Sequence, residues 1–257
     1  MNEYNLTESR FYDLCDKYKS DKSSQHGYHK ILPFYLKDHC NKAGGMLELS
    51  LPGCVQKHKQ MWLEMFPNMH VYMLDKASKT SLEERATVIN CDQGNADDLQ
   101  KVASYIKGQD IPMYFISDDG CHSPVHQVLA FNTFFPLLEV GGVYIIEDIE
   151  VSYWKNGNHH GVSSRYGQGC SGSVIEIFKR AIDGINYEFS QTRDQVKGLC
   201  DRIVQHQQEI HSVSFARNCI IIIKKEFEED RDYRFAHKLQ EQVAGEKYYD
   251  YGTLKYD

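Results

Sequence analysis

The stretch from 113 to 148, MYFISDDGCHSPVHQVLAFNTFFPLLEVGGVYIIED, contains two apolar runs separated by a segment long enough for a helix. The runs at 113–119 and 141–148 are continuously apolar until they end in acids, which is typical of strands buried on both faces of a parallel sheet. Between them, residues 123–138 place large apolar side chains at helical spacing. This stretch therefore predicts a strand, a helix and a second, parallel strand.

The same alternation extends to both sides of this unit. Apolar runs predict further strands at 46–51, 71–75 and 87–92, and helical spacing predicts helices at 55–66, 96–107 and 173–184. Residues 209–216 and 219–225 predict two closing strands joined by a turn at Arg217 and Asn218. We therefore expect an α/β, Rossmann-like fold with a seven-stranded, mostly parallel sheet and an antiparallel C-terminal hairpin, as in class I methyltransferases. A plain doubly wound sheet would give most of the same pattern.

Three segments follow from this pattern. Residues 42–226 form the predicted methyltransferase-like domain, and residues 1–41 form an aromatic N-terminal segment that could cover a site. Residues 227–257 form a charged and aromatic C-terminal tail.

Composition limits the classes of function. The chain has 257 residues, 41% hydrophobic and 25% charged, which suits one domain with a large core. Its formal net charge of −7 argues against nucleic acid as a partner. The eight cysteines show no paired spacing, and no apolar run is long enough to span a membrane. We expect a cytoplasmic protein with reduced thiols and no membrane contact.

Acidic residues gather where two neighbouring predicted strands end. Asp118 and Asp119 end one strand, and Glu147 and Asp148 end the next. Each could cap a following helix, but carboxylates packed so closely repel one another unless a cation lies between them. Asp119, Glu147 and Asp148 are therefore predicted ligands of Mg²⁺ or Mn²⁺, which prefer oxygen ligands.

His122 follows Asp119 by three residues and should face the same edge of the sheet. An imidazole there can accept a proton from a hydroxyl whose pKa a metal has lowered, so we predict His122 as the general base. The alternative is a histidine that only caps or hydrogen-bonds the next helix.

Other acids at this edge suggest a nucleoside cofactor. Asp75 ends a strand where it could accept hydrogen bonds from two ribose hydroxyls, and Asp92 and Gln93 could contact an adenine edge. Tyr28, His29, Tyr153 and Trp154 are candidates for stacking on a sugar, although aromatic residues in loops more often serve packing.

The run ISDDGCHSPVHQVLAFNTFFPLLEVGGVYIIEDIEVSYW (116–154) resembles the macrolide and rhamnosyl sugar O-methyltransferases, a family grouped with the cephalosporin hydroxylases. The resemblance continues through CDQGNADDL (91–99), KQMWLEMFPNMHVYMLD (59–75), YKSDKSSQHGYHKILPFY (18–35) and RYGQGCSGSVIEIFKRAIDGIN (165–186). It therefore covers most of the chain.

This resemblance implies an enzyme that moves a methyl group from S-adenosylmethionine to a hydroxyl of a small sugar-containing substrate. It implies Mg²⁺ on Asp119, Glu147 and Asp148, with His122 as base. Glu48 would lie near the methionine amino group, and Gly53 and Asp118 would complete the cofactor site. Relatives often form multimers through the N-terminal segment. The aromatic segment 1–41 would permit a homo-oligomer of this chain as well.

The chain departs from the family at one loop. Relatives carry a glycine-rich turn after the first strand, whereas this chain has ELSLPGCV (48–55), in which only Gly53 remains. Glycines let the backbone approach a cofactor closely. Two alternatives stay open: an enzyme that keeps the metal site but catalyses another reaction, and a non-catalytic relative that binds a sugar or a protein.

Overall fold

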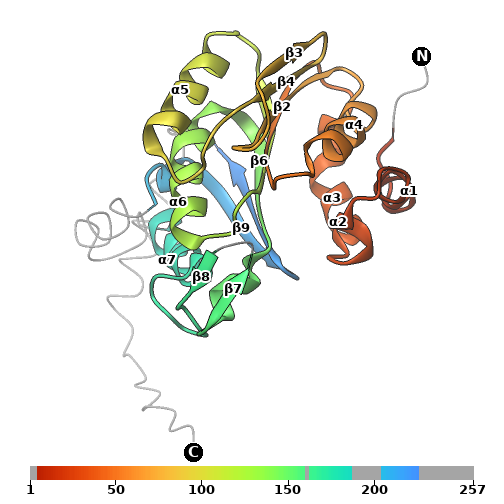
Figure 1. The fold of residues 1–257 in the computed structure, drawn as a ribbon. Coiled ribbons are helices and arrows are strands. Elements are labelled where there is room, and N and C mark those ends of the chain that lie inside the picture. The colour runs from red at the N-terminus through yellow and green to blue at the C-terminus, as the bar shows by residue number, and fades with distance from the viewer. Residues whose placement is uncertain (1–4, 160–161, 187–203, 226–257) are drawn as a thin grey trace, which may run out of the picture. The chain divides into compact units, whose positions relative to one another are not determined.

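The computed structural model describes residues 5–159, 162–186 and 204–225, which build a central sheet covered by helices on both faces (Figure 1). The sheet has eight strands in the order β3-β4-β2-β1-β5-β6-β10-β9. Their bounds are β1 Gly44–Ser50, β2 Met69–Leu74, β3 Ser81–Glu83, β4 Ala86–Ile89, β5 Met113–Asp119, β6 Leu138–Glu147, β9 Ile210–Ala216 and β10 Cys219–Lys224.

Strands β4, β2, β1, β5 and β6 are parallel, and β10 runs antiparallel to both β6 and β9. The predicted mostly parallel sheet with a C-terminal hairpin is thus confirmed. The predicted number of strands was one too low, because β3 adds an antiparallel edge strand. Its three residues are all exposed, so no apolar run marks it in the sequence.

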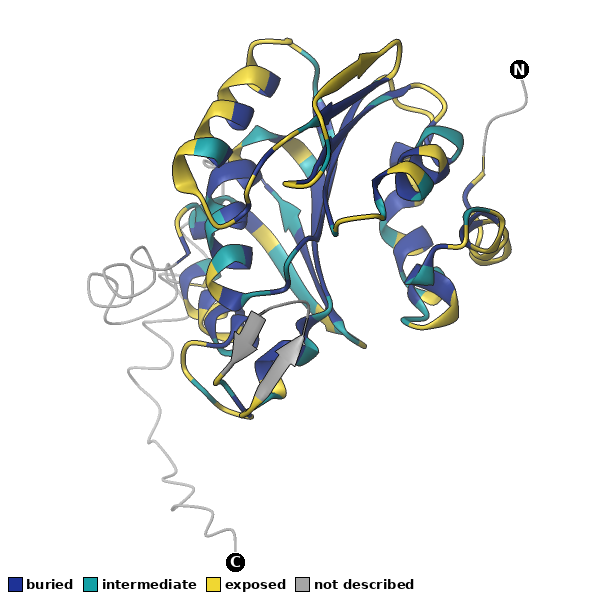
Figure 2. Cartoon of the chain, in the orientation of Figure 1, coloured by how far each residue is buried: buried dark blue, intermediate teal, exposed yellow. Residues whose placement is uncertain are grey.

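Four longer helices connect the strands: α4 Val55–Met65, α5 Ala96–Lys107, α6 Pro124–Phe134 and α7 Val174–Ile185. All four lie where helical spacing predicts them. Helices α5, α6 and α7 bury apolar side chains against one face of the sheet, and α4 buries Met61 and Trp62 against the other. Figure 2 shows the buried sheet between these two layers of half-buried helices.

The strands alternate between these two layers. Ile116 and Tyr144 point toward α5, α6 and α7, whereas Phe115 and Val143 belong to the cluster around Trp62. Successive side chains of a strand face opposite sides, so this alternation also decides where the acids at the strand ends point.

The N-terminal segment packs on the α4 side. It consists of α1 Glu8–Tyr18, α2 Asp21–Ser24, η1 Tyr28–Lys30, α3 Leu32–Leu36 and η2 Lys37–His39. Phe11 of α1 meets the Trp62 ring edge-on at 6.5 Å. The described residues up to 225 belong to one compact unit, so the segment shares the core of the domain.

The remaining elements are short: η3 Phe135–Leu137, η4 Ile149–Tyr153, the hairpin of β7 Gly157–His159 and β8 Val162–Ser164, and η6 Gln207–Glu209. The predicted tail, 227–257, lies outside the described residues. Of the helices described, none combines the length and apolar character needed to cross a bilayer.

Candidate active site

The acids of the site come from neighbouring strands that end at one edge of the sheet. Ser50 of β1 pairs with Asp119 of β5, and Asp118 pairs with Ile146 of β6, so Asp119 and Glu147 lie close together. By strand alternation Glu48, Asp119 and Glu147 share the face that α4 and the N-terminal segment cover. Asp118 points to the opposite face, where its carboxylate accepts a hydrogen bond from Gln93 at 2.7 Å.

A lysine that sequence analysis missed lies among these acids. Lys22 of α2 is 0% exposed, and its Nζ donates to Asp119 Oδ2 at 2.7 Å and to both carboxylate oxygens of Glu147 at 2.7 and 2.8 Å. Ser117 donates a further hydrogen bond to Glu147. Only the SDK triplet within the 18–35 motif could have indicated it, because an isolated lysine normally predicts an exposed side chain.

Asp148 is held by residues from distant parts of the chain. Its Oδ1 lies 3.1 Å from the Tyr28 hydroxyl, accepts a hydrogen bond from the Asn218 amide at 2.9 Å, and lies 3.1 Å from His26 Nδ1. Asp148 itself has φ of 52°, a left-handed conformation that Asp tolerates better than most residues. Tyr28, predicted to stack on a sugar, is buried, and its hydroxyl contacts Asp148.

His122 lies close to two of the acids, Asp119 and Asp148. Its Nε2 lies 3.5 Å from Asp148 Oδ2 and 3.9 Å from Asp119 Oδ1. One ligand atom from each of these three residues lies within 4.8 Å of the others, close enough to hold one metal ion. We call Asp119, His122 and Asp148 the metal corner. Glu147, the third predicted ligand, faces Lys22 in this structure and is not part of the corner.

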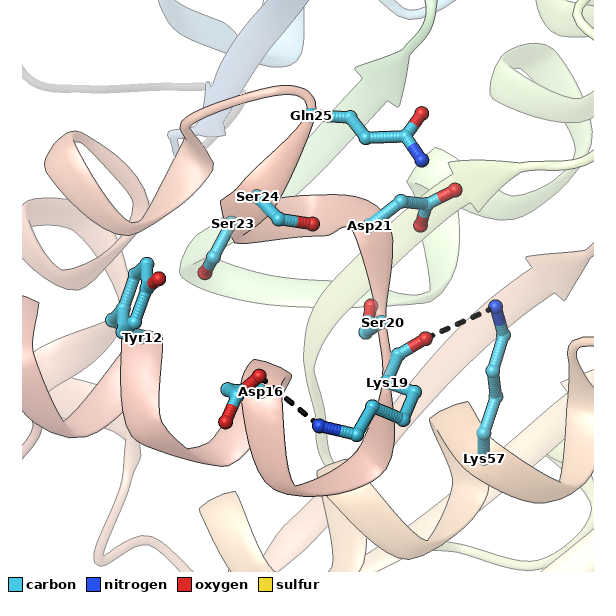
Figure 3. Close-up of a pocket in the computed structure, with 9 residues that line it drawn as sticks. All are labelled: Tyr12, Asp16, Lys19, Ser20, Asp21, Ser23, Ser24, Gln25 and Lys57. Atoms are coloured by element: carbon cyan, nitrogen blue, oxygen red, sulfur yellow. Dashed lines mark hydrogen bonds and ion pairs between the residues drawn. The ribbon is translucent and has the colours of Figure 1, made fainter.

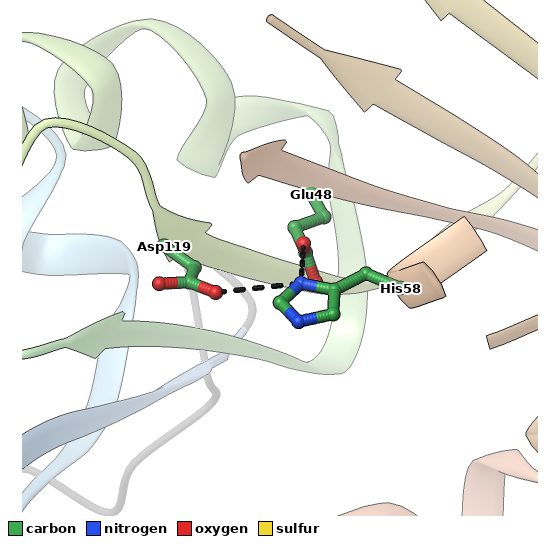
Figure 4. Close-up of side chains that lie close together, drawn as sticks. All are labelled: Glu48, His58 and Asp119. Carbon is green, nitrogen blue, oxygen red and sulfur yellow. Dashed lines mark hydrogen bonds and ion pairs between the residues drawn. The ribbon is translucent and has the colours of Figure 1, made fainter. Parts of the chain in front are cut away.

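A second group capable of holding a metal shares Asp119. Its other members are Glu48 and His58, whose Nδ1 lies 2.7 Å from Glu48 Oε1 and 3.5 Å from Asp119 Oδ2 (Figure 4). Trp62 donates to the second oxygen of Glu48, and Ser20 Oγ lies 3.2 Å from His58 Nε2. We call Glu48, His58 and Lys22 the ion-pair cluster. Both oxygens of Glu48 are therefore engaged by protein groups.

Burial governs the electrostatics of these acids. Burial raises the pKa of Asp119 to about 6 and of Glu147 to about 7, although the Lys22 ammonium opposes both shifts. Burial and the charge of Glu147 raise the pKa of Asp148 to about 7. In contrast, Lys22 and His58 outweigh burial at Glu48 and lower its pKa to about 2. Glu48 is thus ionised, whereas burial disfavours the ionised form of the acids in the metal corner.

Beside the corner lies a pocket of about 590 Å³, formed at the carboxyl ends of β1, β2, β4 and β5. Three predicted cofactor residues line it, namely Asp75, Asp92 and Gln93. Gly120 and Cys121, which lie between Asp119 and His122 in the chain, line it too. The other three predicted cofactor residues, Glu48, Gly53 and Asp118, are not in the lining; Glu48 and Asp118 are fully buried.

No family model matches the chain. Individual proteins do: it is 30% identical over 199 residues to mycinamicin VI 2''-O-methyltransferase of Micromonospora griseorubida, covering 73% of this chain and 47% of that protein. It is 29% identical to 8-demethyl-8-alpha-L-rhamnosyl tetracenomycin-C 2'-O-methyltransferase of Streptomyces olivaceus, covering 68% of this chain and 45% of that protein. The chain is a homologue of these sugar and macrolide O-methyltransferases. It spans about half the length of each.

A solved structure agrees with this relationship. The MycE methyltransferase of the mycinamycin pathway, in complex with Mg, SAH and mycinamycin VI, superimposes with a TM-score of 0.69 at 23% identity, covering 93% of this chain and 60% of that one. The predicted class I methyltransferase fold is therefore confirmed.

The loop in which this O-methyltransferase homologue departs from its family is a regular turn. Cys54 N–H donates to the Leu51 carbonyl at 3.1 Å, Pro52 occupies the second position, and Gly53 has φ of 86°. These features define a type II turn, which requires a glycine at the third position and accepts proline at the second. Ser50, Pro52 and Cys54 line the pocket, so the altered residues form its wall without closing it.

The remaining predicted substrate residues are not brought together by a described contact. His29 packs edge-on against Tyr12, with ring centroids 5.1 Å apart. Tyr153 ends η4 and is 55% exposed, and Trp154 follows it, both a few residues after Asp148. Their contact with a sugar stays a prediction.

Proposed function

We propose that this protein is a metal-dependent O-methyltransferase that moves a methyl group from S-adenosylmethionine to a sugar hydroxyl of a small glycosylated molecule. One observation carries the proposal. A single short loop, Asp119 to His122, contributes two residues to the metal corner and two to the wall of the adjoining pocket. Donor and acceptor sites would therefore meet on this loop, as transfer between them requires.

The charges around the corner fit a divalent cation. When ionised, Glu48, Asp119, Glu147 and Asp148 carry four negative charges, whereas Lys22 and a protonated His58 supply two positive ones. The remaining two negative charges match one Mg²⁺ or Mn²⁺. Asp119 and Asp148 would hold the ion, with Glu147 as the third predicted ligand, and the ion would lower the pKa of a bound hydroxyl.

Of the corner residues, His122 would leave the ion to the carboxylates and accept the proton of that hydroxyl. Its Nε2 lies 3.5 Å from Asp148 Oδ2, where the carboxylate can stabilise the imidazolium that forms. S-adenosylmethionine, when bound, would supply the methyl group on a sulfonium leaving group, and His122 would take the proton that the hydroxyl gives up on receiving that methyl group. Positioning of donor and acceptor would supply most of the rate.

The relatives support the choice of acceptor, since they are named for macrolide glycosides and rhamnosyl groups. The altered loop motivates the alternative of a different reaction at the same metal site. The pocket of about 590 Å³ beside that loop favours retained cofactor binding. The described cysteines are all free, so we place the enzyme in a reducing compartment, as expected for the cytoplasm.

Calorimetric titration of the purified protein with S-adenosylmethionine, with and without Mg²⁺, tests this proposal. Micromolar binding, followed by Mg²⁺-dependent methylation in a panel of rhamnosides and deoxysugar macrolides, is expected. A folded protein that binds Mg²⁺ but not S-adenosylmethionine would favour the different reaction. A protein that binds neither would favour the non-catalytic alternative.

A further inference from the structure

The ammonium group of Lys22 contacts two of the three acids that are predicted to bind the metal ion, Asp119 and Glu147. Its Nζ contacts Asp119 at 2.7 Å and Glu147 at 2.7 and 2.8 Å, and lies 3.8 Å from Glu48. All three donors of an ammonium can be satisfied by these carboxylate oxygens. Lys22 thus already neutralises part of the charge that attracts a cation.

The position of Lys22 is fixed by its surroundings. It belongs to the one-turn helix α2, whose first residue follows Ser20, and Ser20 Oγ accepts the Lys22 backbone N–H at 3.4 Å. The same hydroxyl lies 3.2 Å from His58, and the ammonium lies 5.9 Å from the Trp62 ring centroid. The side chain is fully buried, so it reaches the acids as part of the core.

We propose that Lys22 is an internal cation that competes with the metal ion for Asp119 and Glu147. This inference rests on the proposed metal site. While the metal is absent, Lys22 stabilises the ionised acids. When the metal binds, the ammonium group repels it or must give up hydrogen bonds to the carboxylate oxygens that the metal takes. It is a positioning residue. Its charge weakens the binding of a divalent ion and stabilises the metal-free fold.

The segment that carries Lys22 also shapes the surface next to the site. A second pocket, of about 230 Å³, is lined by residues of α1 and α2 and by Lys57 of α4. Figure 3 shows these lining side chains. Ser20 and Asp21 line it, and Asp21 lines the larger pocket as well. Any shift of Lys22 that accompanies metal binding would therefore alter the walls of both pockets.

The test is Lys22→Met, which keeps the length of the side chain and removes its charge. We expect a lower melting temperature for the metal-free protein, a dissociation constant for Mg²⁺ at least roughly tenfold lower, and a larger rise in melting temperature on adding Mg²⁺. Mg²⁺ alone is the probe, in calorimetry and thermal unfolding. Lys22→Arg, which keeps the charge, should bind Mg²⁺ as the unchanged protein does.

Lys59→Met is the matched control. Lys59 is also buried and also pairs with a carboxylate, Glu83 on β3, but it makes no described contact with the acids of the site. This variant should lose stability without changing Mg²⁺ affinity.

A folded Lys22→Met protein that binds Mg²⁺ no more tightly than the unchanged protein overturns the inference, whereas the metal site would stand. If neither the unchanged protein nor any variant binds Mg²⁺, the predicted metal site itself is wrong. If Lys22→Met fails to fold, Lys22→Gln is measured in the same way. Recovery of folding by Mg²⁺ in either variant supports competition.

Discussion

The ion-pair cluster contacts Asp119 of the metal corner through Lys22 and His58, but the two groups differ in how their charge is balanced. In the cluster, Glu48 lies between His58, Trp62 and Lys22, and its pKa falls to about 2. In the corner, Asp148 is oriented by a phenol and an amide, which carry no charge, and its pKa rises to about 7. Similar residue types thus form an ion-paired structural cluster in one place and, in the other, acids whose ionised form a bound cation would stabilise.

The largest effect should follow from removing an acid that belongs to the corner alone. Asp148→Asn keeps a side chain that tolerates the left-handed backbone but lacks the charge. Because metal-ion catalysis contributes several kcal/mol, we expect methyl transfer to fall about 10³-fold or more, with the melting temperature of the metal-free protein unchanged or raised. Activity and thermal unfolding are measured together. An active, metal-dependent Asp148→Asn protein would contradict the corner.

His122→Ala should have the next largest effect and should separate binding from chemistry. A positioned general base contributes roughly 10²- to 10⁴-fold, so kcat should fall within that range while Mg²⁺ still binds. Calorimetry with Mg²⁺ and single-turnover methylation provide the measurements. Unchanged kcat would assign His122 to capping only.

Glu48→Gln should give the opposite pattern. Breaking a buried ion pair costs about 3–5 kcal/mol, and this change removes the nearest charged partner of His58, leaving it only Asp119 at 3.5 Å. We expect a clear loss of stability in urea unfolding, with Mg²⁺ binding retained. If Glu48→Gln instead weakened S-adenosylmethionine binding without loss of stability, Glu48 would hold the cofactor, as the family resemblance implies.

The smallest effect concerns pH. Asp119 and Asp148 have raised pKa values of about 6 and 7 in the folded protein, so between about pH 4 and 7 the folded state binds more protons than the unfolded state. The metal-free protein should therefore lose stability as pH rises across this range, and the raised pKa of His58 acts in the same direction. Mg²⁺ should stabilise the protein more at pH 8 than at pH 6. A melting temperature that rises with pH without metal would refute this assignment.

The sequence was sufficient for the main elements of the fold. Helix α5 has the predicted bounds, 96–107, because Asn95 caps its first turn and its apolar residues recur at helical spacing. The alternation of strand side chains could also have separated Asp119 from Asp118, since they must face opposite layers. The edge strand β3 carries no such pattern.

The partners of the acids could not be predicted in the same way. Lys22 is separated from Glu147 by 125 residues, and Tyr28 from Asp148 by 120. Local patterns describe neighbours within a strand or a helix, whereas these contacts depend on how the N-terminal segment packs against the finished sheet. The partners of Glu48, which stays a predicted cofactor residue, depend on the same packing, because α4 supplies His58 and Trp62 to that carboxylate.

The contacts of Asp148 have a consequence for biosynthesis. Tyr28 lies within hydrogen-bond distance of the Asn218 carbonyl, 190 residues further along the chain, and both residues contact Asp148. Contacts that close so long a loop form late in folding, after local structure is in place. A ribosome-bound chain that still lacks the β9–β10 turn would contain all three corner residues, but Asp148 would lack its contact with Asn218. Acquisition of the ion would then mark the end of folding.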